Sequence, residues 1–121
     1  HVSMALHHKL AHVLGGSFGL PHAETHAVLL PHTTAYNEVA VAELLAPVAR
    51  AFGGGSAGAG LWRFAKGLGA PMRLADLGLA EADLDRAAEI ATRSPYPNPR
   101  PISRDGIRQL LQSAHDGTSP A

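Results

Sequence analysis

The sequence predicts an all-α fold of about six helices in a single helical domain, residues 1–121. Ala and Leu dominate the chain, and aromatic residues make up only 5% of it. Apolar residues recur at helical spacing and do not alternate as they do in a strand. Glycine, proline and serine stand at intervals that suit helix ends. The core is therefore expected to consist of small aliphatic side chains.

The first three helices follow from glycine and proline signals. A helix that begins at residue 3 should end at residue 14, because the glycine pair 15–16 follows. Pro21 can open the second helix, and Pro31 should kink or restart it. Asn37 is a suitable cap for a third helix, which the glycines 53–55 close. These helices are expected at residues 3–14, 22–30 and 38–52.

The later helices depend on serine caps. Ser56 and Ser103 are good N-cap residues. Apolar stripes are expected on the helix after Ser103 and on a helix at 81–93, the latter formed by Leu84, Ala87, Ala88 and Ala91. The proline-rich run SPYPNPRPIS between them must be extended, since closely spaced prolines forbid a helix. The expected helices are 57–68, 81–93 and 104–114.

Composition excludes several functional classes. Ten basic and ten acidic residues give a net charge of zero, which argues against a nucleic-acid or polybasic membrane binder. There is no cysteine, so disulfides and thiol nucleophiles are excluded. No apolar stretch reaches the roughly 18 residues that span a bilayer, and the first residues do not resemble a signal peptide. A cytoplasmic location is expected.

Histidines are concentrated near the N-terminus, in LHHKLAHVLGGSFGLPHAETHAVLLPH at residues 6–32. His8 and His12 are four residues apart and would share one face of a helix. His22 and His26 repeat this spacing on the next helix. The two pairs can converge on a divalent cation, or form a set of proton donors around an anionic substrate.

As a metal site, this set is incomplete. A divalent site usually adds a carboxylate or cysteine to its imidazoles. The nearby acid, Glu24, lies off the helix face that His22 and His26 share. The other histidines are expected to stand apart from the site. His7 lies about 100° around the helix from His8, and surface or satisfied core positions are expected for His1, His32 and His115.

The segment HHKLAHVLGGSFGLPHAETHAVLLPHTTAYN resembles the second signature of the iron-containing alcohol dehydrogenase superfamily. More narrowly, it is similar to the maleylacetate reductases, which carry PHAETHAV followed by LPH one residue later. The later NPRPI resembles their C-terminal region. The resemblance covers essentially the whole chain and implies the C-terminal helical domain of that fold, without its nucleotide-binding domain.

The resemblance also implies site residues. His8 and His22 match two metal ligands of the alcohol dehydrogenases, whereas His26 matches no ligand. His12 matches a histidine beside the nicotinamide and the substrate, which makes it the catalytic candidate. The remaining ligands of those enzymes, an aspartate and another histidine, come from an earlier helix that this sequence lacks. Only weak binding of iron or zinc is therefore expected.

The implied activity is NADH-dependent reduction of maleylacetate to 3-oxoadipate, in the degradation of aromatic compounds. Maleylacetate reductases are generally regarded as metal-independent, so His8, His12 and His22 would hold the anionic substrate. Arg100 would pair with one of its carboxylates. The glycines 53–55 end a helix and cannot form the family's phosphate loop. The chain is thus expected to be roughly the last third of a larger enzyme, unable to transfer hydride alone.

A second hypothesis remains open at this point. A stand-alone helical domain can use the same histidines for non-redox acid–base chemistry, such as isomerisation, elimination or cyclisation, or for ligand binding. The expected partners are a small anionic substrate and the missing nucleotide-binding domain or another chain. Self-association is also expected, because so small a domain should not cover all of Leu6, Leu10, Val13 and Leu14.

Overall fold

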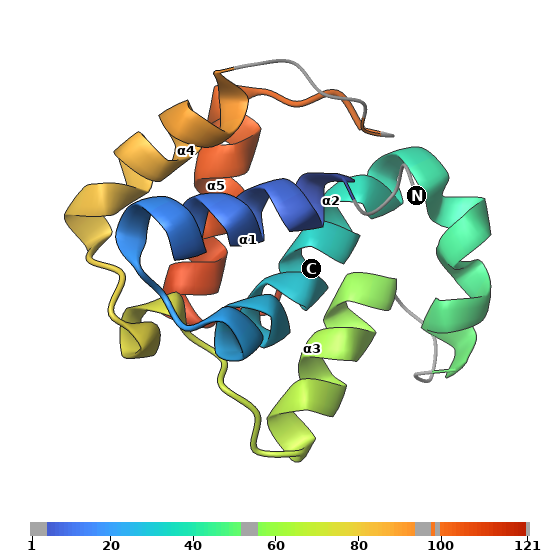
Figure 1. Cartoon of the computed structure of the whole chain (residues 1–121). Helices are drawn as coiled ribbons and strands as arrows, with labels where there is room; N and C mark the ends of the chain where they lie inside the picture. Colours follow the sequence, from blue (N-terminus) through green and yellow to red (C-terminus); the bar gives the residue numbers. More distant parts are fainter. Residues whose placement is uncertain (1–4, 52–55, 94–97, 99, 121) are drawn as a thin grey trace.

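The structure, a computed structural model, describes residues 5–51, 56–93, 98 and 100–120. These residues form α-helices and short 3-10 helices, and no strand occurs among them, so the prediction of an all-α fold is confirmed (Figure 1). The α-helices are α1 (Ala5–Phe18), α2 (His22–Ala51), α3 (Ala57–Gly67), α4 (Leu84–Thr92) and α5 (Arg104–Asp116), with 3-10 helices η2 (Leu74–Leu77) and η3 (Glu81–Asp83).

Helix α1 is longer than predicted. It passes through Gly15 and Gly16 and ends at Phe18, so the prediction of an end at residue 14 was wrong. The residue that stops it is Gly19, whose φ of 69° lies in the left-handed region that favours glycine. The start of the predicted helix, residues 3 and 4, and the predicted stop at 53–55 lie outside the described residues.

Helix α2 joins two predicted helices into one. It continues through Pro31 and Pro47, and Asn37 lies inside it instead of capping a third helix. The predicted restart at Pro31 was therefore wrong. Figure 1 shows that α2 is bent and that its two halves run in different directions, which is a common consequence of internal proline.

The serine caps were predicted correctly. Ser56 Oγ accepts a hydrogen bond of 3.1 Å from the backbone N–H of Ala59, at the start of α3. Ser103 Oγ accepts one of 3.0 Å from Gly106 N–H, at the start of α5. Each serine therefore satisfies a backbone N–H that the helix itself leaves unpaired.

Helix α3 has a second cap, which comes from α2. The Glu38 carboxylate accepts hydrogen bonds from the backbone N–H groups of Ala57 at 2.6 Å and Gly58 at 3.1 Å. A carboxylate at this position also interacts favourably with the positive end of the helix dipole. The two helices touch closely here, because a Cβ at Gly58 would lie 2.5 Å from the Ala35 Cβ and 2.8 Å from the Pro31 carbonyl oxygen.

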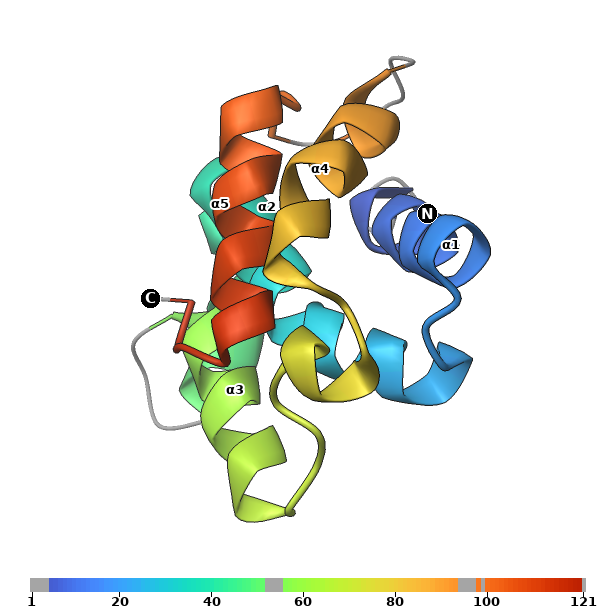
Figure 2. The same ribbon diagram turned by 90° about the vertical axis from the view of Figure 1, so that its left-hand side faces the viewer.

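Helices α4 and α5 pack side by side and bury their predicted apolar stripes (Figures 1 and 2). The predicted helix 81–93 begins as η3 and becomes α4 from Leu84. Helix α1 packs against α2 and α4. Its large apolar side chains are covered, and the expectation that they would remain partly exposed was wrong. Leu6, Leu10, Val13 and Leu14 are between 0% and 3% exposed.

The described surface carries three exposed large apolar side chains, Leu30 on α2 and Phe64 and Leu68 at α3. Within the described residues, no helix has the length and apolar character needed to cross a membrane.

Candidate active site

Helix α1 and the first turns of α2 form an open pocket of about 510 Å³. His8 and His12 line it from α1, and His22 and His26 line it from α2. The rest of the lining is small or apolar: Ala11, Gly15, Gly16 and Leu20. The structure thus brings together the two histidine pairs that were recognised by their spacing, and we call this the histidine pocket.

His26 lies closest to the middle of the group. Its ring centroid is 4.4 Å from that of His22 and 6.3 Å from that of His8. Burial, followed by the neighbouring charges of His22 and His8, lowers the pKa of His26 below its usual value. A neutral imidazole offers one N–H donor and one lone pair, so the pocket presents both kinds of group to a ligand.

These imidazoles do not form a metal site by themselves. In the part of the chain that the structure describes, no three His, Cys, Asp or Glu side chains are placed to hold one metal ion. Glu24, the nearby acid, is exposed and does not line the pocket. The set predicted from the resemblance, His8 and His22, therefore stays a pair of candidate ligands.

His7 lies beneath the pocket. It is 4% exposed, and its Nε2 lies 2.8 Å from Nδ1 of His26. Its Nδ1 lies 3.1 Å from Oγ1 of Thr33. Burial is the largest cause that lowers the pKa of His7 to about 4, and the charges of His26 and His8 add to it. The His7 ring centroid also lies 6.0 Å from that of His8. The expectation that His7 stands apart from the site was therefore wrong, and sequence reasoning missed its link to the pocket through His26.

A signal for this link was present on α2. His26 and Thr33 are seven residues apart, so they share a helix face two turns apart. The link forms only because this face of α2 packs against His7 on α1. Spacing within one helix does not show which neighbouring helix a given face will contact.

Comparison with known proteins places the chain in a family. Residues 1–115 match the model of the Fe-containing alcohol dehydrogenase family, C-terminal. The chain belongs to this family. Maleylacetate reductase from Rhizobium sp. (strain MTP-10005) is 60% identical over 119 residues, which are 98% of this chain and 34% of that protein. Maleylacetate reductase from Burkholderia cepacia is 51% identical over 120 residues, 99% of this chain and 34% of that protein.

Solved structures agree. Maleylacetate reductase from Agrobacterium tumefaciens superposes with a TM-score of 0.92 at 61% identity, over 96% of this chain and 33% of that one. A 1,3-propanediol oxidoreductase superposes with a TM-score of 0.77 at 33% identity, over 90% of this chain and 32% of that one. The chain thus spans about a third of the length of the relatives that it matches. The resemblance to the C-terminal helical part of this family is confirmed.

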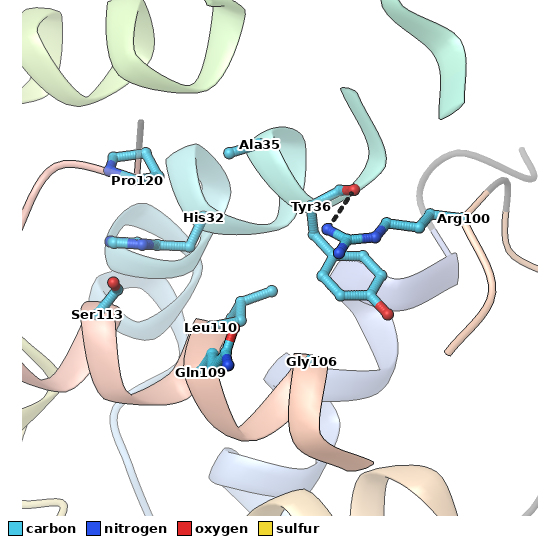
Figure 3. Close-up of a pocket in the computed structure, with 9 residues that line it drawn as sticks. All are labelled: His32, Ala35, Tyr36, Arg100, Gly106, Gln109, Leu110, Ser113 and Pro120. Atoms are coloured by element: carbon cyan, nitrogen blue, oxygen red, sulfur yellow. Dashed lines mark hydrogen bonds between the residues drawn. The ribbon is translucent and has the colours of Figure 1, made fainter. Parts of the chain in front are cut away.

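In this member of the family, Arg100 lies away from the histidine pocket. It lines a second pocket of about 270 Å³ between α2 and α5 (Figure 3). Its guanidinium carbon lies 4.1 Å from the centroid of the Tyr36 ring, and its Nη1 donates a 3.2 Å hydrogen bond to the Tyr36 carbonyl oxygen. These contacts hold Arg100 against α2, so the structure does not bring Arg100 together with His8, His12 and His22.

His32 lines the same second pocket, toward the opposite side from Arg100 in the view of Figure 3. It is 2% exposed, and neither ring nitrogen has a hydrogen-bond partner among the described residues. Burial lowers the pKa of His32 to about 4. The expectation of a satisfied core histidine was therefore wrong for His32. It was right for His115, which is 8% exposed and whose Nδ1 lies 2.9 Å from Oδ1 of Asp116; His1 lies outside the described residues.

Proposed function

We propose that this chain forms the histidine-bearing wall of the active site of a maleylacetate reductase, an oxidoreductase that uses NADH to reduce maleylacetate to 3-oxoadipate. The observation that carries the proposal is that His8, His12 and His22 line one pocket. The identity of 60% to the Rhizobium reductase supports it. Because the chain spans about a third of such proteins, the nucleotide-binding part is its proposed partner, with self-association as a further proposal.

The proposed substrate is a dicarboxylate anion, and the pocket suits it chemically. Imidazole N–H groups of His8 and His22 would donate hydrogen bonds to a carboxylate, more strongly when the rings are protonated. NADH, when bound by the rest of the enzyme, supplies the hydride. His12 would hold the proton that the reduced substrate takes up, which makes it the catalytic candidate. The exposed positions of all three rings leave them open to a ligand.

The family's iron does not enter this proposal as a reactant. The described residues supply imidazoles without a carboxylate, and they form no complete ligand set. We propose that His8 and His22 bind iron or zinc weakly at most, because a tight site usually needs about four protein ligands.

The stand-alone hypothesis is not favoured. The similarity to the Rhizobium maleylacetate reductase covers 98% of the chain, with 60% identity over those 119 residues. A cytoplasmic location remains part of the proposal and fits the cysteine-free sequence.

The test is a chimera in which this chain replaces the matching third of the Rhizobium reductase. We expect maleylacetate-dependent NADH oxidation and a loss of roughly 100-fold or more on His12→Ala, the usual scale for a proton donor. His22→Ala should weaken maleylacetate binding, because it removes a hydrogen bond to a carboxylate. His115→Gln, far from the pocket on α5, is the matched control and should retain activity. A folded chimera without this oxidation would refute the proposal, as would full activity in both pocket variants.

A further inference from the structure

A chain of hydrogen bonds links the histidine pocket to the interior of the protein. It begins at Nδ1 of His26, 2.8 Å from Nε2 of His7. Nδ1 of His7 lies 3.1 Å from Oγ1 of Thr33. The Thr33 hydroxyl in turn donates to the carbonyl oxygens of Leu29 and Leu30, each at 3.2 Å. His7 and Thr33 are buried, so no bulk water competes for these groups.

The Leu29 and Leu30 carbonyl groups at the end of this series of hydrogen bonds determine which group donates in each bond. A carbonyl oxygen can only accept, so the Thr33 proton points toward Leu29 and Leu30 and its oxygen accepts from the N–H at Nδ1 of His7. A ring buried as deeply as His7 favours a single proton, and Nδ1 already uses it toward Thr33. Its Nε2 therefore carries a lone pair that accepts from Nδ1–H of His26. The remaining nitrogen of His26, Nε2, is left with a lone pair, and His26 lines the histidine pocket.

The opposite direction satisfies fewer groups. In it, Thr33 donates to His7, and His7 donates from Nε2 to His26. The single Thr33 hydroxyl proton, which the Leu29 and Leu30 carbonyl oxygens share, then no longer points at them. Counting that shared contact as one bond, two hydrogen bonds remain in place of three. One net internal hydrogen bond of ordinary strength favours the first arrangement roughly five-fold.

We propose that His26 is the fixed hydrogen-bond acceptor of the histidine pocket, with His7 and Thr33 as positioning residues that keep its proton on Nδ1 and its Nε2 lone pair toward the ligand. His8, His12 and His22 have no such support, since no hydrogen bond given by a described residue fixes their rings. The family resemblance assigned His26 to no ligand position, and this role rests on the structure.

The ligand class follows from this lone pair. A lone pair repels carboxylate oxygens and attracts a hydroxyl or enol O–H. Taking the dicarboxylate from the proposed function, on which this step rests, the carboxylates belong with the other three histidines and an O–H group belongs against His26. The histidine pocket should therefore prefer a hydroxydicarboxylate to a dicarboxylate of equal length.

The tautomers can be measured without any turnover. In the chain labelled with ¹⁵N-histidine, two-bond ¹H–¹⁵N couplings near neutral pH distinguish a proton on Nδ1 from one on Nε2. We expect Nδ1–H for both His7 and His26. Thr33→Val should shift both rings toward Nε2–H, Thr33→Ser should restore Nδ1–H, and Thr34→Val, one position along the same helix, is the matched control. Nε2–H at His26 in the unsubstituted chain would overturn the proposal, whether recorded in the chain alone or in the chimera.

The ligand preference is tested with malate and succinate, which differ by one hydroxyl. We expect malate to bind roughly five-fold more tightly, the worth of one net hydrogen bond. Thr33→Val should reverse or abolish this ratio, and His26→Ala should abolish it. Equal affinities in the unsubstituted chain, or no malate binding at all, would overturn the ligand assignment. A chimera that fails to reduce maleylacetate refutes only the proposed function, because neither the tautomers nor this ratio depends on NADH.

Discussion

His32 should make the fold sensitive to mild acid. Its ring is 2% exposed, and burial lowers its pKa to about 4 in the folded chain. In the unfolded chain an imidazole titrates near pH 6.5. A lowered pKa in the folded state means that the stability is present above about pH 6.5 and is lost as the pH falls toward about pH 4. Linkage gives a loss of about 2 kcal/mol of unfolding free energy from His32 between about pH 7 and about pH 5.

Urea unfolding followed by circular dichroism at these two pH values measures the effect. His32→Leu should reduce the pH-dependent loss by about 2 kcal/mol. It should cost little stability near neutral pH, because it removes two ring nitrogens that have no partner among the described residues. Val28→Ala, a buried position on α2 that does not titrate, is the control and should lower stability equally at both pH values. The same pH-dependent loss in His32→Leu as in the unsubstituted chain would refute this reasoning.

Two further predictions concern the contact between α2 and α3. Gly58→Ala should lower the unfolding free energy by about 1–3 kcal/mol, because its Cβ would lie 2.5 Å from the Ala35 Cβ, whereas Gly16→Ala meets nothing within 4 Å and should be neutral or stabilising. Glu38→Gln should cost about 1 kcal/mol by removing the charged cap of α3. Thermal unfolding measures both, and a Gly58→Ala variant as stable as Gly16→Ala, or an unchanged Glu38→Gln, would contradict them.

Local signals predicted the fold where the interaction itself is local. Ser56 and Ser103 cap their helices through backbone groups three residues away, so a short window of sequence contains both partners. The predicted helix restart at Pro31 was wrong because the deciding interactions are not local. The local cost of Pro31 inside a helix is about 3 kcal/mol, but Leu29 and Tyr36 on either side of it are buried in the core and hold α2 together. That compensation comes from neighbours distant in sequence.

In the candidate site, too, the sequence predicted the relations within one helix and missed those that depend on packing between segments. The pairs His8–His12 and His22–His26 were recognisable because each lies on one helix, and the structure places both pairs on one pocket. Arg100 was assigned to the same site only through the resemblance, and its actual position depends on its packing against Tyr36, a residue distant in sequence. The contact of His7 with His26 depends on the packing of α1 against α2, which no spacing within either helix specifies.

The concentration of histidine near the N-terminus has a physical explanation in this packing. A protonated His7 would carry protons on both nitrogens and could not accept from His26. The burial that lowers the pKa of His7 to about 4 keeps its Nε2 lone pair available near neutral pH. The exposed rings of His8, His12 and His22 line the open pocket, where a ligand can reach them. Buried and exposed histidines therefore have different proposed roles. His7 orients the ring of His26, and His8, His12 and His22 contact the ligand.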